Sequence, residues 1–194
     1  YYTPTGRSIQ KPYEDGDEYS RDIISRYNHG EFFHADSIRF DDSLKYTTPK
    51  GRTVYGGGGI MPDYFVPLDT TLNSHYLNEL YTSTSIQEYT FGYAESQKDR
   101  LLKKGFDDFL KSFVVTDQML LDLAKVGERN KVKSDRKELA RKKSLFQVHV
   151  KAQIARKLWS NEGFFPVINE TNEILIQALK LFDRIPAELD HSAM

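Results

Sequence analysis

The sequence predicts an α+β fold in which a small β-rich segment, residues 1–70, precedes an α-helical bundle, residues 71–194. Most of the glycines and prolines, which favour turns, lie in the first segment. The second segment has long stretches with apolar residues at helical spacing and few helix breakers. A chain of 194 residues is long enough for one ordinary domain or two small ones.

The first 30 residues predict a strand–turn–strand unit and one helix. Residues 1–3 and 8–10 have the composition of short strands, and the Pro-Thr-Gly sequence between them is typical of a tight turn. Residues 18–29 carry apolar side chains at helical spacing. Gly30 follows at the position where a helix commonly ends in a left-handed residue.

The rest of the β-rich segment predicts a hairpin and one further strand. Residues 44–48 and 53–55 flank the turn sequence Pro49-Lys50-Gly51, which favours an antiparallel hairpin. Residues 32–40 contain two short apolar groups that predict either short strands or an ordered loop. Residues 64–66, Tyr-Phe-Val, are apolar and β-favouring, so a strand is expected there.

The second segment predicts a series of helices that pack as a small bundle. Ser74 and Thr116 are good N-caps, and Gly105 and Gly127 are expected to end helices. The expected helices span residues 74–80, 85–104, 106–113, 116–127, 134–160 and 169–182.

Composition excludes several classes of site and partner. The chain has no cysteine, which excludes disulfides and zinc–cysteine sites. No apolar run approaches the roughly 20 residues that a membrane span needs. The net charge of −1 argues neither for nor against a nucleic-acid partner, and we expect none. Because Tyr1 opens the sequence without a methionine and leads directly into a strand, we expect a fragment of a longer protein.

Two short segments resemble motifs of the C-terminal processing (tail-specific) peptidases. Residues 1–10, YYTPTGRSIQ, are similar to the family's strand–turn–strand motif at ten contiguous positions. Residues 59–63, GIMPD, resemble the G-I-x-P-D motif that follows it in that family. Residues 112–123 and 155–169 also resemble its helical tail.

Residues 11–54 depart from the family pattern, because many members pass almost directly from the first motif to the second. The insertion includes the expected helix and hairpin, and in its length the chain resembles the Bacteroidetes-type members. On this resemblance, residues 1–70 are the last strands of a protease core that carries an insertion, and residues 71–194 are the helical C-terminal domain.

The resemblance implies a serine-type endopeptidase that cleaves proteins near their C-termini in the bacterial periplasm or cell envelope. In that family a serine nucleophile, a lysine general base and a PDZ domain precede the first motif. We therefore assign no catalytic, cofactor-binding or metal-binding residue to this chain, expect no cofactor, and expect the chain to be inactive by itself. Expected partners are the missing protease core and PDZ domain, protein or peptide substrates, and a second copy if the chain forms a homo-oligomer.

Two other functions stay open at this stage. One is a stand-alone helical protein-interaction module. The other is a degenerate family member that keeps the fold but has lost the serine and lysine.

Several local patterns favour structural over chemical interpretations. Gly56–Gly59 are not followed by the lysine and hydroxyl of a phosphate-binding loop, so they are expected to permit a tight backbone path. His29 and His34, with Glu31 and Asp36 nearby, lack the spacing of a zinc motif. Asp63 is expected to cap a turn or a strand end.

A basic run in the helical segment is interpreted as the solvated face of a helix. Ser134 and Ser144 lie beside these cations, but an exposed lysine keeps its high pKa and is a poor general base, so a local Ser–Lys dyad is not expected. The cations of the run are Lys131, Lys133, Arg136, Lys137, Arg141, Lys142 and Lys143.

Overall fold

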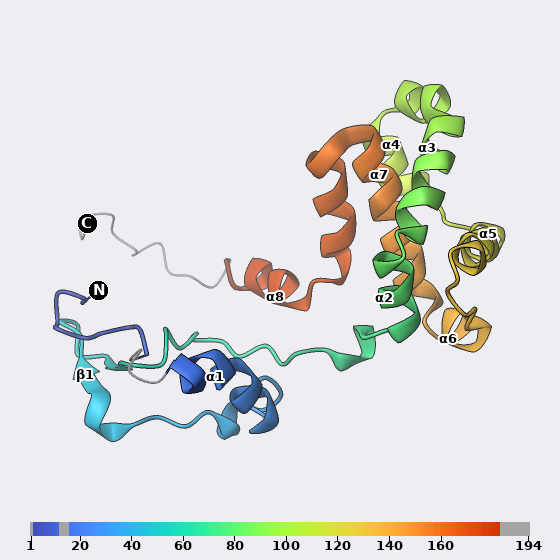
Figure 1. The fold of residues 1–194 in the computed structure, drawn as a ribbon. Coiled ribbons are helices and arrows are strands. Elements are labelled where there is room, and N and C mark those ends of the chain that lie inside the picture. Colours follow the sequence, from blue (N-terminus) through green and yellow to red (C-terminus); the bar gives the residue numbers. More distant parts are fainter. Residues whose placement is uncertain (1, 12–15, 183–194) are drawn as a thin grey trace. The chain divides into compact units, whose positions relative to one another are not determined.

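The computed structural model describes residues 2–11 and 16–182 (Figure 1). The chain forms two compact units, Tyr1–Leu68 and Asp69–Met194. The described part is mostly helical with one two-stranded antiparallel sheet, which confirms the α+β class in its coarse form.

The first unit opens with the predicted turn. Tyr2 and Ser8 form an isolated antiparallel bridge. Between them, the Thr3 amide donates to the Arg7 carbonyl oxygen at 2.9 Å, and the Gly6 amide donates to the Thr3 carbonyl oxygen at 2.9 Å. The turn and the antiparallel approach of its two arms are therefore confirmed, whereas the described residues of the two predicted strands form only this single bridge.

Helix α1, Gly16–Asn28, lies close to its predicted position. Gly30 has a φ of 82°, which confirms the left-handed residue expected after the helix. The next residues contain a short 3₁₀ helix, η1 (Ala35–Ser37), within an ordered loop, so the loop rather than the strands forms there.

The predicted hairpin is confirmed. Strands β1, Lys45–Thr47, and β2, Thr53–Tyr55, pair antiparallel with Tyr46 opposite Val54. A second 3₁₀ helix, η2 (Asp42–Leu44), leads into β1. The predicted strand at residues 64–66 is wrong: this segment has no ladder partner among the described residues, and a strand needs one.

The described residues of the first unit form no buried core. Every described residue in 2–11 and 16–68 whose burial is known is exposed or only partly buried. On α1, Ile23 and Ile24 are 70% and 62% exposed. Apolar side chains that stay in water contribute little to stability.

The second unit is a helical bundle (Figure 1). Ser74 and Thr116 accept hydrogen bonds from the amides of Leu77 (3.0 Å) and Met119 (3.3 Å), which confirms both predicted N-caps. Gly105, with a φ of 86°, ends the third helix as predicted. The α-helices are α2 (His75–Thr82), α3 (Ser85–Lys104), α4 (Phe106–Ser112), α5 (Asp117–Arg129), α6 (Arg136–Arg141), α7 (Lys143–Ile168) and α8 (Glu173–Phe182), with 3₁₀ helices η3 (Thr70–Leu72) and η4 (Asn169–Thr171).

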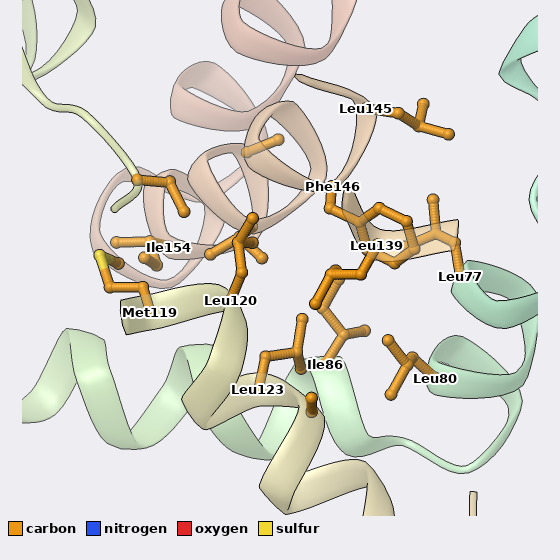
Figure 2. Close-up of a cluster of buried hydrophobic side chains, with 14 of the residues drawn as sticks. Leu77, Leu80, Ile86, Met119, Leu120, Leu123, Leu139, Leu145, Phe146 and Ile154 are labelled. Atoms are coloured by element: carbon orange, nitrogen blue, oxygen red, sulfur yellow. The ribbon is translucent and has the colours of Figure 1, made fainter. Parts of the chain in front are cut away.

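The core of this unit lies around α3 and α7, with α2, α5 and α6 contributing to it (Figure 2). Leu80, Ile86, Leu123, Phe146 and Ile154 come from four different helices and are all fully buried. Burial of such side chains contributes roughly 1.5–3 kcal/mol each, so this core accounts for most of the apolar stabilisation in the described chain.

Gly127 does not end α5 as predicted, since the helix continues to Arg129. A Cβ atom at this position would lie 2.7 Å from Leu80 Cδ2. Close packing between α5 and α2, and not a left-handed backbone conformation, therefore explains why residue 127 is a glycine.

The single helix predicted over residues 134–160 is also wrong. The backbone leaves the helical region at Lys142, which separates α6 from α7, and the Lys142 ammonium donates to the Asn73 carbonyl oxygen. Helix α7 continues to Ile168 but kinks at Trp159 and Ser160, where Ser160 has φ 57° and ψ −147°.

The last predicted helix begins late. Residues 169–171 form η4, and α8 starts only at Glu173.

None of the described helices is long and apolar enough to cross a membrane.

Candidate functional site

The two motif segments of the first unit lie next to each other. The Gly57 amide donates to the Ser8 carbonyl oxygen at 2.9 Å, and the Gly59 amide donates to the Ile9 carbonyl oxygen at 2.8 Å. Backbone hydrogen bonds thus join the end of YYTPTGRSIQ to Gly57 and to Gly59, the first residue of GIMPD, although the two segments are some fifty residues apart in the sequence.

The glycine run makes this close approach feasible. A Cβ atom on Gly56 would lie 2.9 Å from the Ser8 carbonyl oxygen, and one on Gly57 would lie 2.7 Å from Leu44 Cδ1. Gly57 also has a φ of 73°, a conformation that other residues rarely adopt. These contacts confirm the tight backbone path expected for the glycines.

Two arginines connect the motifs to the hairpin. The Arg7 guanidinium donates to the Tyr55 carbonyl oxygen at 3.2 Å. The Arg52 guanidinium forms an ion pair with Asp63, and both side chains are exposed. Asp63 was expected to cap a turn or a strand end. In the structure its carboxylate instead binds the side chain of Arg52, an arginine of the hairpin.

An open cavity of ≈ 380 Å³ lies beside these contacts. Arg7 and the Arg52–Asp63 pair line it, together with apolar side chains that include Ile60 and Met61. Arg7 Nε is buried and has no hydrogen-bond partner among the described residues. The lining residues include no serine, histidine, cysteine or lysine, so this cavity contains neither member of a Ser–Lys dyad.

The histidines of the first unit, His29 and His34, do not belong to a group of side chains that could bind a metal ion. Glu31 accepts from Arg26 Nε at 2.8 Å, while His29, His34 and Asp36 are exposed. Within residues 2–11 and 16–182, no group of three or more histidine, aspartate or glutamate side chains could hold a metal ion.

The basic run divides into paired and unpaired cations. Lys142 donates to a backbone carbonyl, and Lys143 Nζ lies 2.5 Å from an Asp117 carboxylate oxygen. Ser144 is exposed on α7, whereas the Ser134 hydroxyl is buried without a hydrogen-bond partner. The five other cations are exposed and have no ion pair or hydrogen bond with any described residue: Lys131, Lys133, Arg136, Lys137 and Arg141.

The sequence analysis missed a polar network in the helical unit. The Tyr81 hydroxyl lies 2.9 Å from His149 Nδ1, and Gln153 Nε2 donates to the same hydroxyl at 3.3 Å. Burial lowers the pKa of His149 and raises the pKa of Tyr81. His149 lies between the buried residues Phe146 and Val150, and no local motif distinguishes it from a core position.

Comparison with known protein families matches part of the helical unit. No curated protein and no solved structure matches the chain. A family of unknown function (DUF8443) matches residues 76–160, from the start of α2 to the kink in α7. Over these residues of its helical unit, the chain is similar to that family.

Proposed function

We propose that this chain is the non-catalytic C-terminal portion of a C-terminal processing serine endopeptidase. The observation that carries the proposal is the hydrogen-bonded contact between YYTPTGRSIQ and the segment leading into GIMPD, because the two segments that resemble the family are also neighbours in space. The parent enzyme would cleave proteins near their C-termini in the periplasm or cell envelope. Its serine, lysine and PDZ domain would lie ahead of residue 1.

The lack of buried apolar side chains among the described residues of the first unit supports this role. Its described residues include exposed apolar side chains but no buried ones, so they need another surface to become stable. A protease sheet that pairs with the first motif and covers these side chains would supply that surface. The chain would then brace the catalytic site without contributing a nucleophile or a base.

The test is the full-length product of the gene. We expect it to hydrolyse a peptide with a free apolar C-terminus, and expect alanine at the upstream serine or lysine to abolish turnover. Asp63→Asn should lower kcat severalfold, because it breaks the ion pair between the second motif and the hairpin. Glu95→Gln, on an exposed part of α3, is the matched control and should leave kcat unchanged.

Two outcomes would contradict the proposal. A gene without a serine and a lysine ahead of the first motif would exclude an active parent enzyme and would leave a degenerate member. Hydrolysis by the isolated chain, sensitive to a serine-directed inhibitor, would show that the chain is itself catalytic.

A second candidate is a helical protein-interaction module. The observation that favours it is the family match, which lies entirely within the helical unit and includes neither motif. A gene whose reading frame begins near Tyr1, with a product that binds a protein partner and hydrolyses no peptide, would support this candidate instead.

A further inference from the structure

Helix α7 reverses direction where its backbone leaves the helical region, between a first part, residues 143–158, and a second part, residues 161–168 (Figure 1). A Cβ atom on Gly163 would lie only 2.8 Å from the Ala155 carbonyl oxygen. Eight residues of continuous helix would hold these positions about 12 Å apart, so the second part runs back against the first.

The reversal depends on a backbone conformation that serine rarely adopts. Ser160 has φ 57° and ψ −147°, close to a region that is populated almost only by glycine. Thr84, by contrast, has φ 60° and ψ 10° and lies near the ordinary left-handed region. A strained residue of this kind persists only where the surrounding packing holds it, so the kink is kept by the contacts that the chain makes after it.

Those contacts belong to a segment that we call the arm, residues 161–182. Val167 of the arm is fully buried in the core, and Phe164 and Ile168 pack against the same core. The Arg156 guanidinium lies 5.0 Å from the centre of the Phe164 ring. Within the described chain, the arm is joined to the rest of the helical unit only at the kink, so its site on the core is equally suited to the arm of a second copy.

The arm also carries apolar side chains that the described chain leaves in water. Phe165 is 51% exposed, and on α8 Ile174, Leu179 and Phe182 are 65%, 58% and 67% exposed. None of the ten residues of α8 is buried. Clustered apolar side chains of this kind mark interaction surfaces, so the arm has a reason to meet another chain.

We propose that the helical unit forms a homodimer in which two copies exchange their arms. Trp159 and Ser160 become helical, the two parts of α7 form one continuous helix, and each arm occupies the site on the other copy. The contacts of Val167 and Phe164 are all kept, while the strain at Ser160 is released in both copies.

The kink is suited to such an exchange. Short hinges under strain favour the swapping of elements between copies. Neither Trp159 nor Ser160 is glycine or proline, so both residues adopt helical angles at ordinary cost. The inference depends on the helical unit alone and is independent of the proposed protease role.

The first experiment is analytical ultracentrifugation of the whole chain over a wide range of concentrations. We expect a monomer–dimer equilibrium. Ser160→Gly should weaken dimerisation at least tenfold, because glycine adopts the kinked conformation without strain and disfavours the straight helix. Ser160→Ala should strengthen dimerisation severalfold, because alanine favours the helix and keeps the Cβ atom. Ser144→Gly, at an exposed serine of the same helix outside the kink, is the matched control and should change the dissociation constant less than twofold.

The second experiment distinguishes exchanged arms from a dimer of closed chains. The chain has no cysteine, so the double variant Arg156→Cys, Phe164→Cys places two thiols at side chains that contact each other across the kink. A short bis-maleimide added to the isolated dimer should join two chains covalently. The double variant Gln118→Cys, Asp122→Cys is the control, because these side chains lie one turn apart on α5 and should be joined within one chain.

Three results would overturn the proposal. One is a monomer at every concentration. Another is a dimer whose dissociation constant is the same for Ser160→Gly and Ser144→Gly, since the kink would then have no part in its formation. The third is a dimer in which the thiols at 156 and 164 are joined only within one chain. Should that double variant fail to fold, the opposite responses of Ser160→Gly and Ser160→Ala decide the question.

Discussion

At the scale of single residues, two helical glycines have opposite consequences. A Cβ atom on Gly127 would lie 2.7 Å from Cδ2 of the fully buried Leu80, whereas one on Gly92 would meet no atom within 4 Å. Gly127→Ala should lower the free energy of unfolding by roughly 1–3 kcal/mol through overpacking. Gly92→Ala should raise it by about 1 kcal/mol through helix propensity. Urea denaturation of both variants checks these opposite signs, and a stabilising Gly127→Ala would contradict the close contact.

His149 should make stability depend on pH. Burial lowers its pKa below the ordinary value of 6.5, so the unfolded chain binds more protons than the folded chain around that pH. The stabilisation is complete above pH 6.5 and is lost as pH falls toward the folded pKa. Thermal melts from pH 8 to pH 5.5 should therefore show a falling Tm, with a smaller slope for His149→Gln. His75→Gln is the control, because the His75 side chain is 86% exposed. If His75→Gln changed the dependence of Tm on pH as much as His149→Gln does, the pH dependence could not be assigned to His149.

At the scale of elements, the start of α2 depends on one hydroxyl. Ser74 is 3% exposed and accepts from the Leu77 amide at 3.0 Å. Ser74→Ala should lower the free energy of unfolding by roughly 0.5–2 kcal/mol, because an amide in the first turn loses its partner. Ser96→Ala, on the exposed face of α3, should change it by less than about 0.5 kcal/mol. Guanidinium titration measures both, and similar values for the two variants would mean that the cap contributes nothing.

Elements with local signals were predictable from the sequence. The helix over 85–104 and the hairpin turn at Pro49-Lys50-Gly51 have their own capping and turn residues, and both agree with the structure. The strand at 64–66 was wrongly predicted because apolar composition does not supply a pairing partner. The break at Lys142 was missed because Leu139 and Phe146 are seven residues apart, and the apolar spacing continues across the break.

Sites assembled by packing were harder to predict than elements. The sequence identified Ser134 and the basic residues around it, because a run of charged residues can be recognised from the sequence alone. It did not identify His149, because a histidine next to apolar core residues forms no local motif and its partner Tyr81 lies on another helix.

At the scale of the whole molecule, the two units should differ in autonomy. All the buried apolar residues of the described chain lie in the second unit. We expect residues 69–194 alone to unfold cooperatively at the same denaturant midpoint as the whole chain. Residues 1–68 alone should show no cooperative transition and rapid amide exchange, because no apolar core opposes their conformational entropy. Slow amide exchange in the isolated first unit would contradict this expectation.

The kink at Trp159 and Ser160 has a consequence for how the helical unit is divided. The similarity to the family of unknown function stops at residue 160, where the backbone of α7 also leaves the helical region. The segment after the kink nevertheless packs on the helices before it, since Val167 is fully buried in their core and a Cβ atom on Gly163 would lie 2.8 Å from the Ala155 carbonyl oxygen. A fragment that ended at residue 160 would therefore leave an apolar part of that core in contact with water.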